Sequence, residues 1–133
     1  MPNDRKIPAP RTILVVDDDE AFRRSLRLLL ELDGFTVTTA ENGVRGLQAF
    51  RNQNPDIVLV DIMMPKLGGM ETIRQMRRER PGAKVIAMSG SARMGGLDFA
   101  AAARELGAVA ALGKPFDPAA LASLLRDLLP QTA

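Results

Sequence analysis

The sequence predicts an α/β fold of five parallel strands covered by helices on both faces. Over its 133 residues, short apolar runs alternate with segments whose apolar residues recur at helical spacing. Runs that are apolar on both faces are typical of parallel strands, whose crossover connections cover both surfaces of a sheet. No internal repeat and no linker to a second domain interrupts the pattern. We therefore predict a single (βα)5 unit with the strand order 2-1-3-4-5, the commoner order for five strands.

The strand candidates are short apolar runs separated by helix-like segments. The last of them is the weakest, because alanine is a poor strand residue. In chain order they are TILVV (12–16), FTVTT (35–39), DIVLVD (56–61), KVIAM (84–88) and AVAAL (108–112).

The segments between these runs predict helices. The fourth, 97–106, is helical by its alanine content, and the last begins at a cap formed by Asp117, with Pro118 in its first turn. The expected inward-facing residues are Phe22, Leu26, Leu29 and Leu30 in 21–32, Val44, Leu47 and Phe50 in 41–53, Met70, Ile73 and Met76 in 69–80, and Leu121, Leu124, Leu125 and Leu128 in the last helix.

Composition limits the chemistry and the location. With 46% apolar and 26% charged residues the chain is a folded protein, and no apolar run is long enough to span a bilayer. Its first ten residues lack the apolar centre of a signal peptide, so a cytoplasmic location is expected. The absence of Cys and His excludes disulfides, thiolate or imidazole metal sites, and histidine bases. Residues 1–10 and 131–133 are expected to be tails of a domain spanning 11–130.

The charge balance gives no case for a nucleic-acid partner, and the absence of a long apolar run gives none for membrane insertion. The net charge is only +2, and the arginines of the first and third helices are interspersed with glutamates. The chain has no Trp or Tyr to stack on bases. These arginine runs are therefore interpreted as solvated helix faces.

Polar residues follow the apolar strands at one edge of the predicted sheet, where open parallel sheets bind ligands. The first strand is followed by DDDE, the third ends in Asp61, the fourth leads to Ser89, and the fifth leads to Lys114. In the order 2-1-3-4-5, Asp61 lies between the acid cluster and Ser89. A buried carboxylate after IVLV would cost several kcal/mol unless it were paired or metal-bound.

This set of residues suits phosphoryl transfer at a divalent cation. Oxygen ligands without His or Cys select a hard cation such as Mg²⁺. An ammonium and a hydroxyl beside it can neutralise and position a phosphoryl group, and a carboxylate can be the nucleophile. Asp19, next to the acid pair, is expected to cap the first helix instead.

Over essentially residues 11–130 the chain resembles the receiver domain of bacterial two-component response regulators, which has a flavodoxin-like fold. The resemblance rests on LVVDDD (14–19), IVLVDIMMP (57–65) with Gly69, MSGS (88–91) and KPF (114–116), in order and on the expected strands. It resembles the chemotaxis-regulator-like, stand-alone members of the family, unless these 133 residues are a fragment of a longer regulator.

The resemblance implies a phosphorylation switch and no turnover enzyme. It implies that Asp61 accepts a phosphoryl group from a histidine kinase or histidine phosphotransfer protein. It further implies that Asp17, Asp18, Asp61 and the backbone carbonyl of Met63 hold Mg²⁺, that Ser89 and Lys114 contact the phosphoryl group, and that the Lys114–Pro115 bond is cis. The expected output is binding to a downstream protein, relay of the phosphoryl group, or a homodimer.

Two positions depart from the family pattern. Ala111 occupies the place of the usual aromatic switch residue, so the surface around the fourth helix is expected to switch differently or less. The loop SGSARMGGLDF, with Gly90, Gly95 and Gly96, is longer than usual and is expected to be mobile. The resemblance implies that Met63 and Ser91 border the path of the hydrolytic water. Because the Met63 side chain has no amide or carboxylate to orient that water, we predict slow autodephosphorylation.

Three alternatives remain open at this stage. An aspartyl-phosphate phosphatase would want a second aspartate at the position of Met63. A flavodoxin-like nucleotide binder would need a phosphate-binding loop where DDDE stands. A receiver-like adaptor that is never phosphorylated is disfavoured by the complete set of acids, hydroxyl and lysine, and weakly favoured by Ala111.

Overall fold

The structure is a computed structural model, and it describes residues 11–64, 68–90, 93–94 and 97–129. Its main sheet contains five parallel strands in the order β2-β1-β3-β4-β7. Because β7 is the fifth strand of this sheet along the chain, the predicted order is confirmed. These strands are β1 (Thr12–Val16), β2 (Thr36–Ala40), β3 (Ile57–Asp61), β4 (Val85–Ser89) and β7 (Ala110–Gly113).

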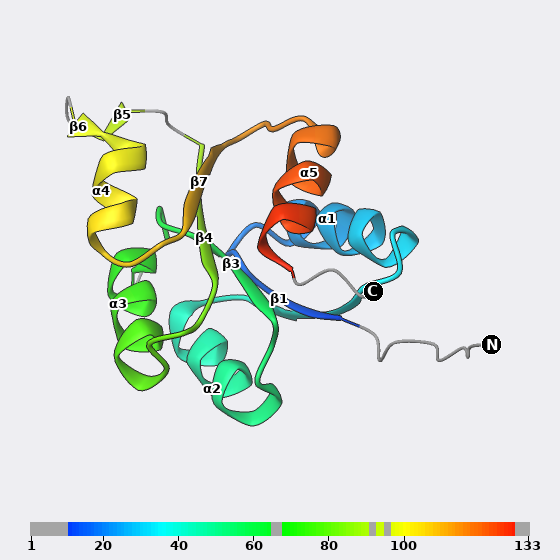
Figure 1. Ribbon diagram of the computed structural model, residues 1–133, viewed down its shortest axis with the longest axis horizontal. Coiled ribbons are helices and arrows are strands. Elements are labelled where there is room, and N and C mark those ends of the chain that lie inside the picture. Colours follow the sequence, from blue (N-terminus) through cyan, green and yellow to red (C-terminus); the bar gives the residue numbers. More distant parts are fainter. Residues whose placement is uncertain (1–10, 65–67, 91–92, 95–96, 130–133) are drawn as a thin grey trace.

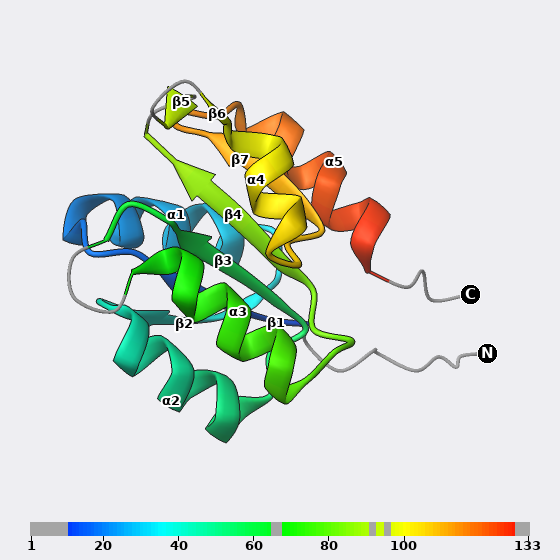
Figure 2. The ribbon, with the colours of Figure 1, turned by 90° about the vertical axis from the view of Figure 1, so that its left-hand side faces the viewer.

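Helices cover both faces of the sheet, as Figures 1 and 2 show. On one face lie α1 and α5, and on the other lie α2, α3 and α4. The helices are α1 (Glu20–Leu32), α2 (Gly43–Gln53), α3 (Gly69–Glu79), α4 (Phe99–Glu105) and α5 (Pro118–Leu128). Within the described residues no helix has the length and apolar character needed to cross a membrane.

Alternation along the strands divides the core into two layers. In β1, Ile13 and Val15 pack toward α1 and α5, while Leu14 and Val16 pack toward α2 and α3. The central strand β3 is buried at every position. Each fully buried aliphatic side chain contributes about 1.5–3 kcal/mol to the free energy of unfolding. The buried strands therefore hold the residues at their ends in place.

Side-chain caps set where several helices begin. The carboxylate of Asp19 accepts a hydrogen bond from the backbone N of Phe22 at 3.2 Å, and that of Asp117 accepts one from Ala119 N at 2.9 Å. Both caps confirm the sequence prediction. Asn42 caps α2 through Arg45 N at 2.8 Å, so α2 starts at Gly43 and is shorter than expected.

The inward face of α2 differs from the prediction. Val44 is 52% exposed, whereas Gly43 and Gly46 are buried. A Cβ at position 46 would lie 2.9 Å from Cγ2 of Val16, so the helix packs on β1 through its glycines. Val44 lies about 100° around the helix from Gly43 and therefore faces solvent. In α5, Leu121 and Leu125 are buried, while Leu124 and Leu128 are only partly buried.

A short antiparallel pair follows β4 that the sequence did not predict. It consists of β5 (Arg93–Met94) and β6 (Leu97–Asp98). Ser91, Gly95 and Gly96 lie outside the described residues, so the mobility expected for this loop stays a prediction.

Candidate functional site

Three carboxylates meet at the carboxyl edge of the sheet. Val16 of β1 pairs in register with Val60 of β3, so Asp17 and Asp61, each one residue further along, emerge side by side. Asp17, Asp18 and Asp61 each offer an oxygen atom within 4.8 Å of the others. Asp17 is fully buried and Asp61 is 5% exposed, whereas Asp18 is exposed.

Backbone amides orient the two buried carboxylates. Oδ1 of Asp17 accepts a hydrogen bond from Asp19 N at 2.9 Å, and Oδ1 of Asp61 accepts one from Met63 N, also at 2.9 Å. The Asp17 carbonyl oxygen accepts a further bond from Arg23 Nη1 at 2.6 Å. The Oδ2 atoms of both carboxylates are thereby turned toward the same neighbour, Lys114.

Lys114 bridges the two buried carboxylates. Its Nζ lies 2.6 Å from Asp17 Oδ2 and 3.2 Å from Asp61 Oδ2. The resemblance implied that Lys114 contacts the phosphoryl group on Asp61, and in the structure its shorter contact is to Asp17. The Lys114 amide donates to the Ser89 carbonyl oxygen at 2.7 Å, which joins the loop after β7 to the end of β4. The Lys114–Pro115 bond is cis, as predicted.

The electrostatics leave this pocket with an excess of negative charge. Burial acts to lower the pKa of Lys114, but the hydrogen bond to Asp17 and the charges of Asp17 and Asp61 outweigh it and raise that pKa. Burial also raises the pKa of Asp17; Asp61 adds to this rise, while the bonds from Lys114 and Asp19 oppose it. One ammonium thus faces three carboxylates. Their oxygen-only donor set fits a hard divalent cation such as Mg²⁺.

Two further predicted residues lie around the carboxylates. Ser89 ends β4 and is fully buried, one position beyond Met88, which pairs with Asp61. Met63 is 54% exposed, and its backbone N, bonded to the Asp61 carboxylate at 2.9 Å, places the residue beside the site. Ser91, the other residue expected near the water path, lies outside the described residues.

Gly69 fits the end of β3 closely. A Cβ at this position would lie 2.1 Å from the Asp61 carbonyl oxygen and 2.3 Å from Ile62 Cα. The first residue of α3 therefore packs directly on the backbone that carries Asp61. The sequence placed Gly69 at the start of the helix expected over 69–80, and the contact gives a physical reason for glycine there.

Sequence reasoning missed the contact of one aromatic residue with Lys114. Phe22 was assigned to the core, but its ring centroid lies 4.0 Å from Lys114 Nζ. Its place in the first turn after the acid cluster was the available signal, because that turn must pass close to the pocket.

Ala111 lies in β7 opposite Ala87 and is partly buried.

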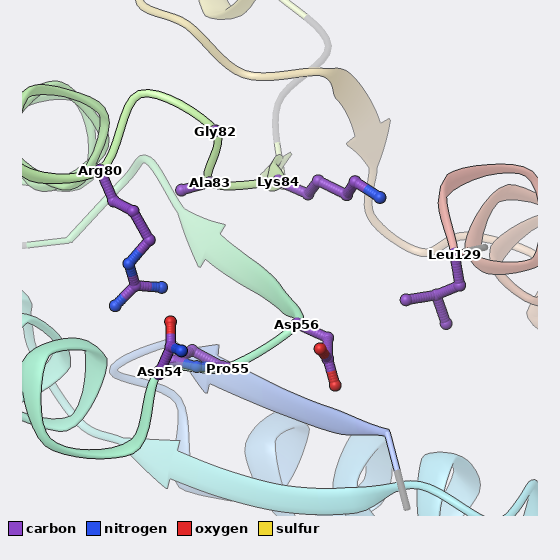
Figure 3. Close-up of a pocket in the computed structure, with 8 residues that line it drawn as sticks. All are labelled: Asn54, Pro55, Asp56, Arg80, Gly82, Ala83, Lys84 and Leu129. Atoms are coloured by element: carbon purple, nitrogen blue, oxygen red, sulfur yellow. The ribbon is translucent and has the colours of Figure 1, made fainter. Parts of the chain in front are cut away.

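A pocket at the opposite end of the sheet does not carry comparable chemistry. It has a volume of about 270 Å³ and is shown in Figure 3. Its polar side chains are engaged in hydrogen bonds to the protein backbone. Arg80 donates to the Phe50 carbonyl oxygen at 2.9 Å, Lys84 donates to the Leu128 carbonyl oxygen, and Asp56 accepts from Thr12 N at 2.8 Å. The acidic edge is therefore the better candidate.

Comparisons with known proteins agree with this geometry. The family model described as "Response regulator receiver domain" matches residues 13–126. Response regulator MprA of Mycobacterium sp. (strain KMS) is 39% identical over 128 residues, which are 93% of this chain and 53% of MprA. The chain thus spans about half the length of the curated relatives it matches.

Solved structures share the fold over most of the chain. A chain of the CheX–CheY–BeF3–Mg²⁺ complex from Borrelia burgdorferi is similar with a TM-score of 0.83 and 26% identity, covering 92% of this chain and 91% of that one. A response regulator from Burkholderia pseudomallei, solved with a phosphorylated aspartic acid, a calcium ion and citrate, gives a TM-score of 0.76 at 26% identity, covering 85% and 65%. The match of the family model, the sheet order and the acidic edge lead to one conclusion: this chain belongs to the receiver domain family of two-component response regulators.

Proposed function

We propose that Asp61 is the phosphoacceptor of a Mg²⁺-dependent switch, and that residues 11–130 form the receiver domain. The observation that carries the proposal is the position of its carboxylate, which ends β3 within 3.2 Å of Lys114 and beside Asp17 and Asp18. The phosphorylated aspartate of the B. pseudomallei regulator supports it. The donor is a phosphohistidine of a sensor kinase or of a phosphotransfer protein. We expect this transfer to occur in the cytoplasm.

The three carboxylates and the backbone carbonyl of Met63 would hold the Mg²⁺ ion. When bound, the ion offsets negative charge on the phosphoryl oxygens and on the carboxylates themselves. The carboxylate oxygens of Asp17, Asp18 and Asp61, which lie within 4.8 Å of one another, support a cation at this position. The Mg²⁺ in the B. burgdorferi complex is consistent with it.

In the reaction, a carboxylate oxygen of Asp61 attacks the donor phosphorus. The new O–P bond forms as the P–N bond of the phosphohistidine breaks, and the imidazole leaves with the bonding electron pair. The ammonium of Lys114 donates hydrogen bonds to the phosphoryl oxygens, and the Ser89 hydroxyl donates a hydrogen bond to one of these oxygens. The protein carries out its own phosphorylation in this way, and water later removes the group. The modified domain then acts on a downstream protein or forms a homodimer.

The proposal is tested by intact-mass analysis after incubation with Mg²⁺ and a small acyl phosphate such as acetyl phosphate. We expect the gain of a single phosphoryl group, and borohydride reduction followed by peptide mapping should place it on Asp61. If no group is gained, the domain is a receiver-like adaptor. If phosphate is released catalytically with many turnovers, the domain is a phosphatase.

Binding of Mg²⁺ is expected to stabilise the folded domain. A ligand at about 100 times its Kd adds about 2.7 kcal/mol to the free energy of unfolding, so Mg²⁺ should raise Tm by several degrees. Asp18→Ala should abolish this rise, whereas Glu105→Ala, which removes an exposed carboxylate of α4 outside the cluster, should keep it. A thermal melt with and without Mg²⁺ measures both, and an equal rise in the two variants would place the ion elsewhere.

The phosphorylated domain is expected to lose its phosphate slowly. Met63 is exposed at the pocket rim and carries no amide or carboxylate to orient a water molecule. Met63→Asn should therefore speed the decay of phosphorylated protein, by about tenfold or more if the amide positions the attacking water. Time-resolved intact mass after removal of the donor measures the decay, and an unchanged half-life would contradict the explanation.

A further inference from the structure

The ammonium of Lys114 has an aromatic neighbour that the proposed reaction does not use. Its Nζ lies 4.0 Å from the ring centroid of Phe22, in addition to its contacts with Asp17 and Asp61. The Lys114 side chain is only 16% exposed. Two carboxylates and one ring face therefore surround the ammonium, and the ring attracts the cation through its quadrupole without forming a directed hydrogen bond.

The Phe22 ring is held from two sides. The backbone N of Phe22 donates to the carboxylate of Asp19, the cap of α1, at 3.2 Å. The ring packs edge-on against Phe116, with centroids 5.9 Å apart and planes at 87°, an orientation that aromatic pairs prefer. Because Phe116 follows Lys114 by two residues, the segment that presents the lysine also presents the partner of the ring.

Phosphoryl transfer changes what Lys114 must bind. Before transfer its donors serve the Oδ2 atoms of Asp17 and Asp61. During transfer, negative charge appears on the phosphoryl oxygens and the attacking Asp61 oxygen becomes part of a bond to phosphorus. The ammonium must shift toward the new oxygens on a flexible four-carbon chain. A ring face permits this movement and still attracts the cation, whereas a hydrogen-bond acceptor would have to be released.

From this geometry we infer that Phe22 is a positioning residue for Lys114, which keeps the ammonium over the pocket while it changes partners; the inference rests on the proposed function. A purely structural role is the competing explanation, because Phe22 also packs against the core between the sheet, α1 and α5. The two differ in one respect. Positioning depends on the ring face, whereas a structural role depends only on apolar volume.

The test compares Phe22→Leu with Phe22→Tyr in the complete chain. Leucine keeps an apolar side chain and removes the ring face, so the rate of phosphorylation by acetyl phosphate at saturating Mg²⁺ should fall by about tenfold, within the range of a partly buried cation–π contact. Tyrosine keeps the ring and should restore most of the rate. Intact-mass time courses measure the rates, and thermal melts measure stability.

Leu124→Ala is the matched control for stability. Leu124 is partly buried in the same core layer, on α5, and lies outside the acidic edge. This variant should lower Tm without lowering the phosphorylation rate of the folded protein. The inference is overturned if Phe22→Leu retains the wild-type rate, if Phe22→Tyr is as slow as Phe22→Leu, or if Leu124→Ala shows the same loss.

A second measurement separates this inference from the proposed function. The ring current of Phe22 should shift the Lys114 side-chain proton resonances upfield in the unphosphorylated protein, and the shift should disappear in Phe22→Leu and persist in Phe22→Tyr. An upfield shift in a wild-type protein that gains no phosphate would overturn the proposed function and leave the contact established. Absence of the shift in a protein that is phosphorylated would overturn the inference alone.

Discussion

Asp61→Asn is expected to abolish phosphorylation while leaving the domain folded. The amide has almost the same shape as the carboxylate, and its oxygen can still accept the hydrogen bond from Met63 N that the carboxylate accepts at 2.9 Å. It is, however, not a competent nucleophile toward phosphorus. Lys114 keeps its 2.6 Å contact to Asp17, and the charge of Asp61 that helps to raise the pKa of Asp17 is removed. We therefore expect a Tm in the absence of Mg²⁺ that is no lower than that of the wild type.

Intact mass after treatment with acetyl phosphate and Mg²⁺ measures this effect, and Asp56→Asn is the matched control. Asp56 precedes the same strand at its other end, where it accepts from Thr12 N at 2.8 Å, a bond that an amide oxygen can also accept. This control should gain a phosphoryl group at the wild-type rate. Phosphorylation of Asp61→Asn at another carboxylate would show that Asp61 is not the sole acceptor.

Gly69→Ala is expected to produce the largest loss of stability among single substitutions near the site. The added Cβ would lie 2.1 Å from the Asp61 carbonyl oxygen. Because that atom belongs to the backbone of the buried strand β3, no side-chain rotation can relieve the overlap. Either α3 or the end of β3 must move. Such overpacking typically costs about 1–3 kcal/mol of the free energy of unfolding, and a clash with backbone atoms should lie at the upper end of that range. The movement also displaces Asp61, so phosphorylation should slow in the fraction that remains folded.

Urea unfolding of Gly69→Ala measures the loss, with Gly68→Ala as its neighbour control. A Cβ at position 68 meets only the Met64 carbonyl oxygen, at 3.9 Å, and Gly68 lies at the N-cap of α3 with φ of −67°. Its replacement should cost about 1 kcal/mol or less. Equal losses in the two variants would mean that the helix start, and not the contact with β3, determines the effect.

The arrangement of the sheet and the gathering of acids at one edge were predictable from sequence alone. Apolar runs on both faces, separated by helical segments, indicate parallel strands, and parallel strands end at a common edge. DDDE follows β1 and Asp61 ends β3, so the two are close together if these strands are neighbours. The structure confirms that they are. The caps at Asp19 and Asp117 were equally accessible, because a cap depends on residues within one turn of chain.

Some features could not be predicted because they depend on packing through glycine. The exposure of Val44 follows from the close approach of Gly46 to Val16, and the fit of Gly69 follows from where α3 meets β3. An argument from apolar periodicity does not count glycine as an inward-facing residue, so it predicts neither the packing of Gly46 on Val16 nor that of Gly69 on β3. The antiparallel pair β5–β6 also lies in a segment without a strand-like apolar pattern.

The sequence by itself determined the fold class and the kinds of groups at the acidic edge, because these depend on local periodicity and on which strand each residue follows. The strand order was predicted only as the commoner one for five strands, and the structure confirms it. Only the tertiary structure decided how those groups meet. Lys114 contacts Asp17 across 97 residues of chain and Asp61 across 53, and Phe22 reaches the same ammonium from α1. These contacts join residues far apart in the chain, and they arise from the packing of α1, α5 and the sheet together.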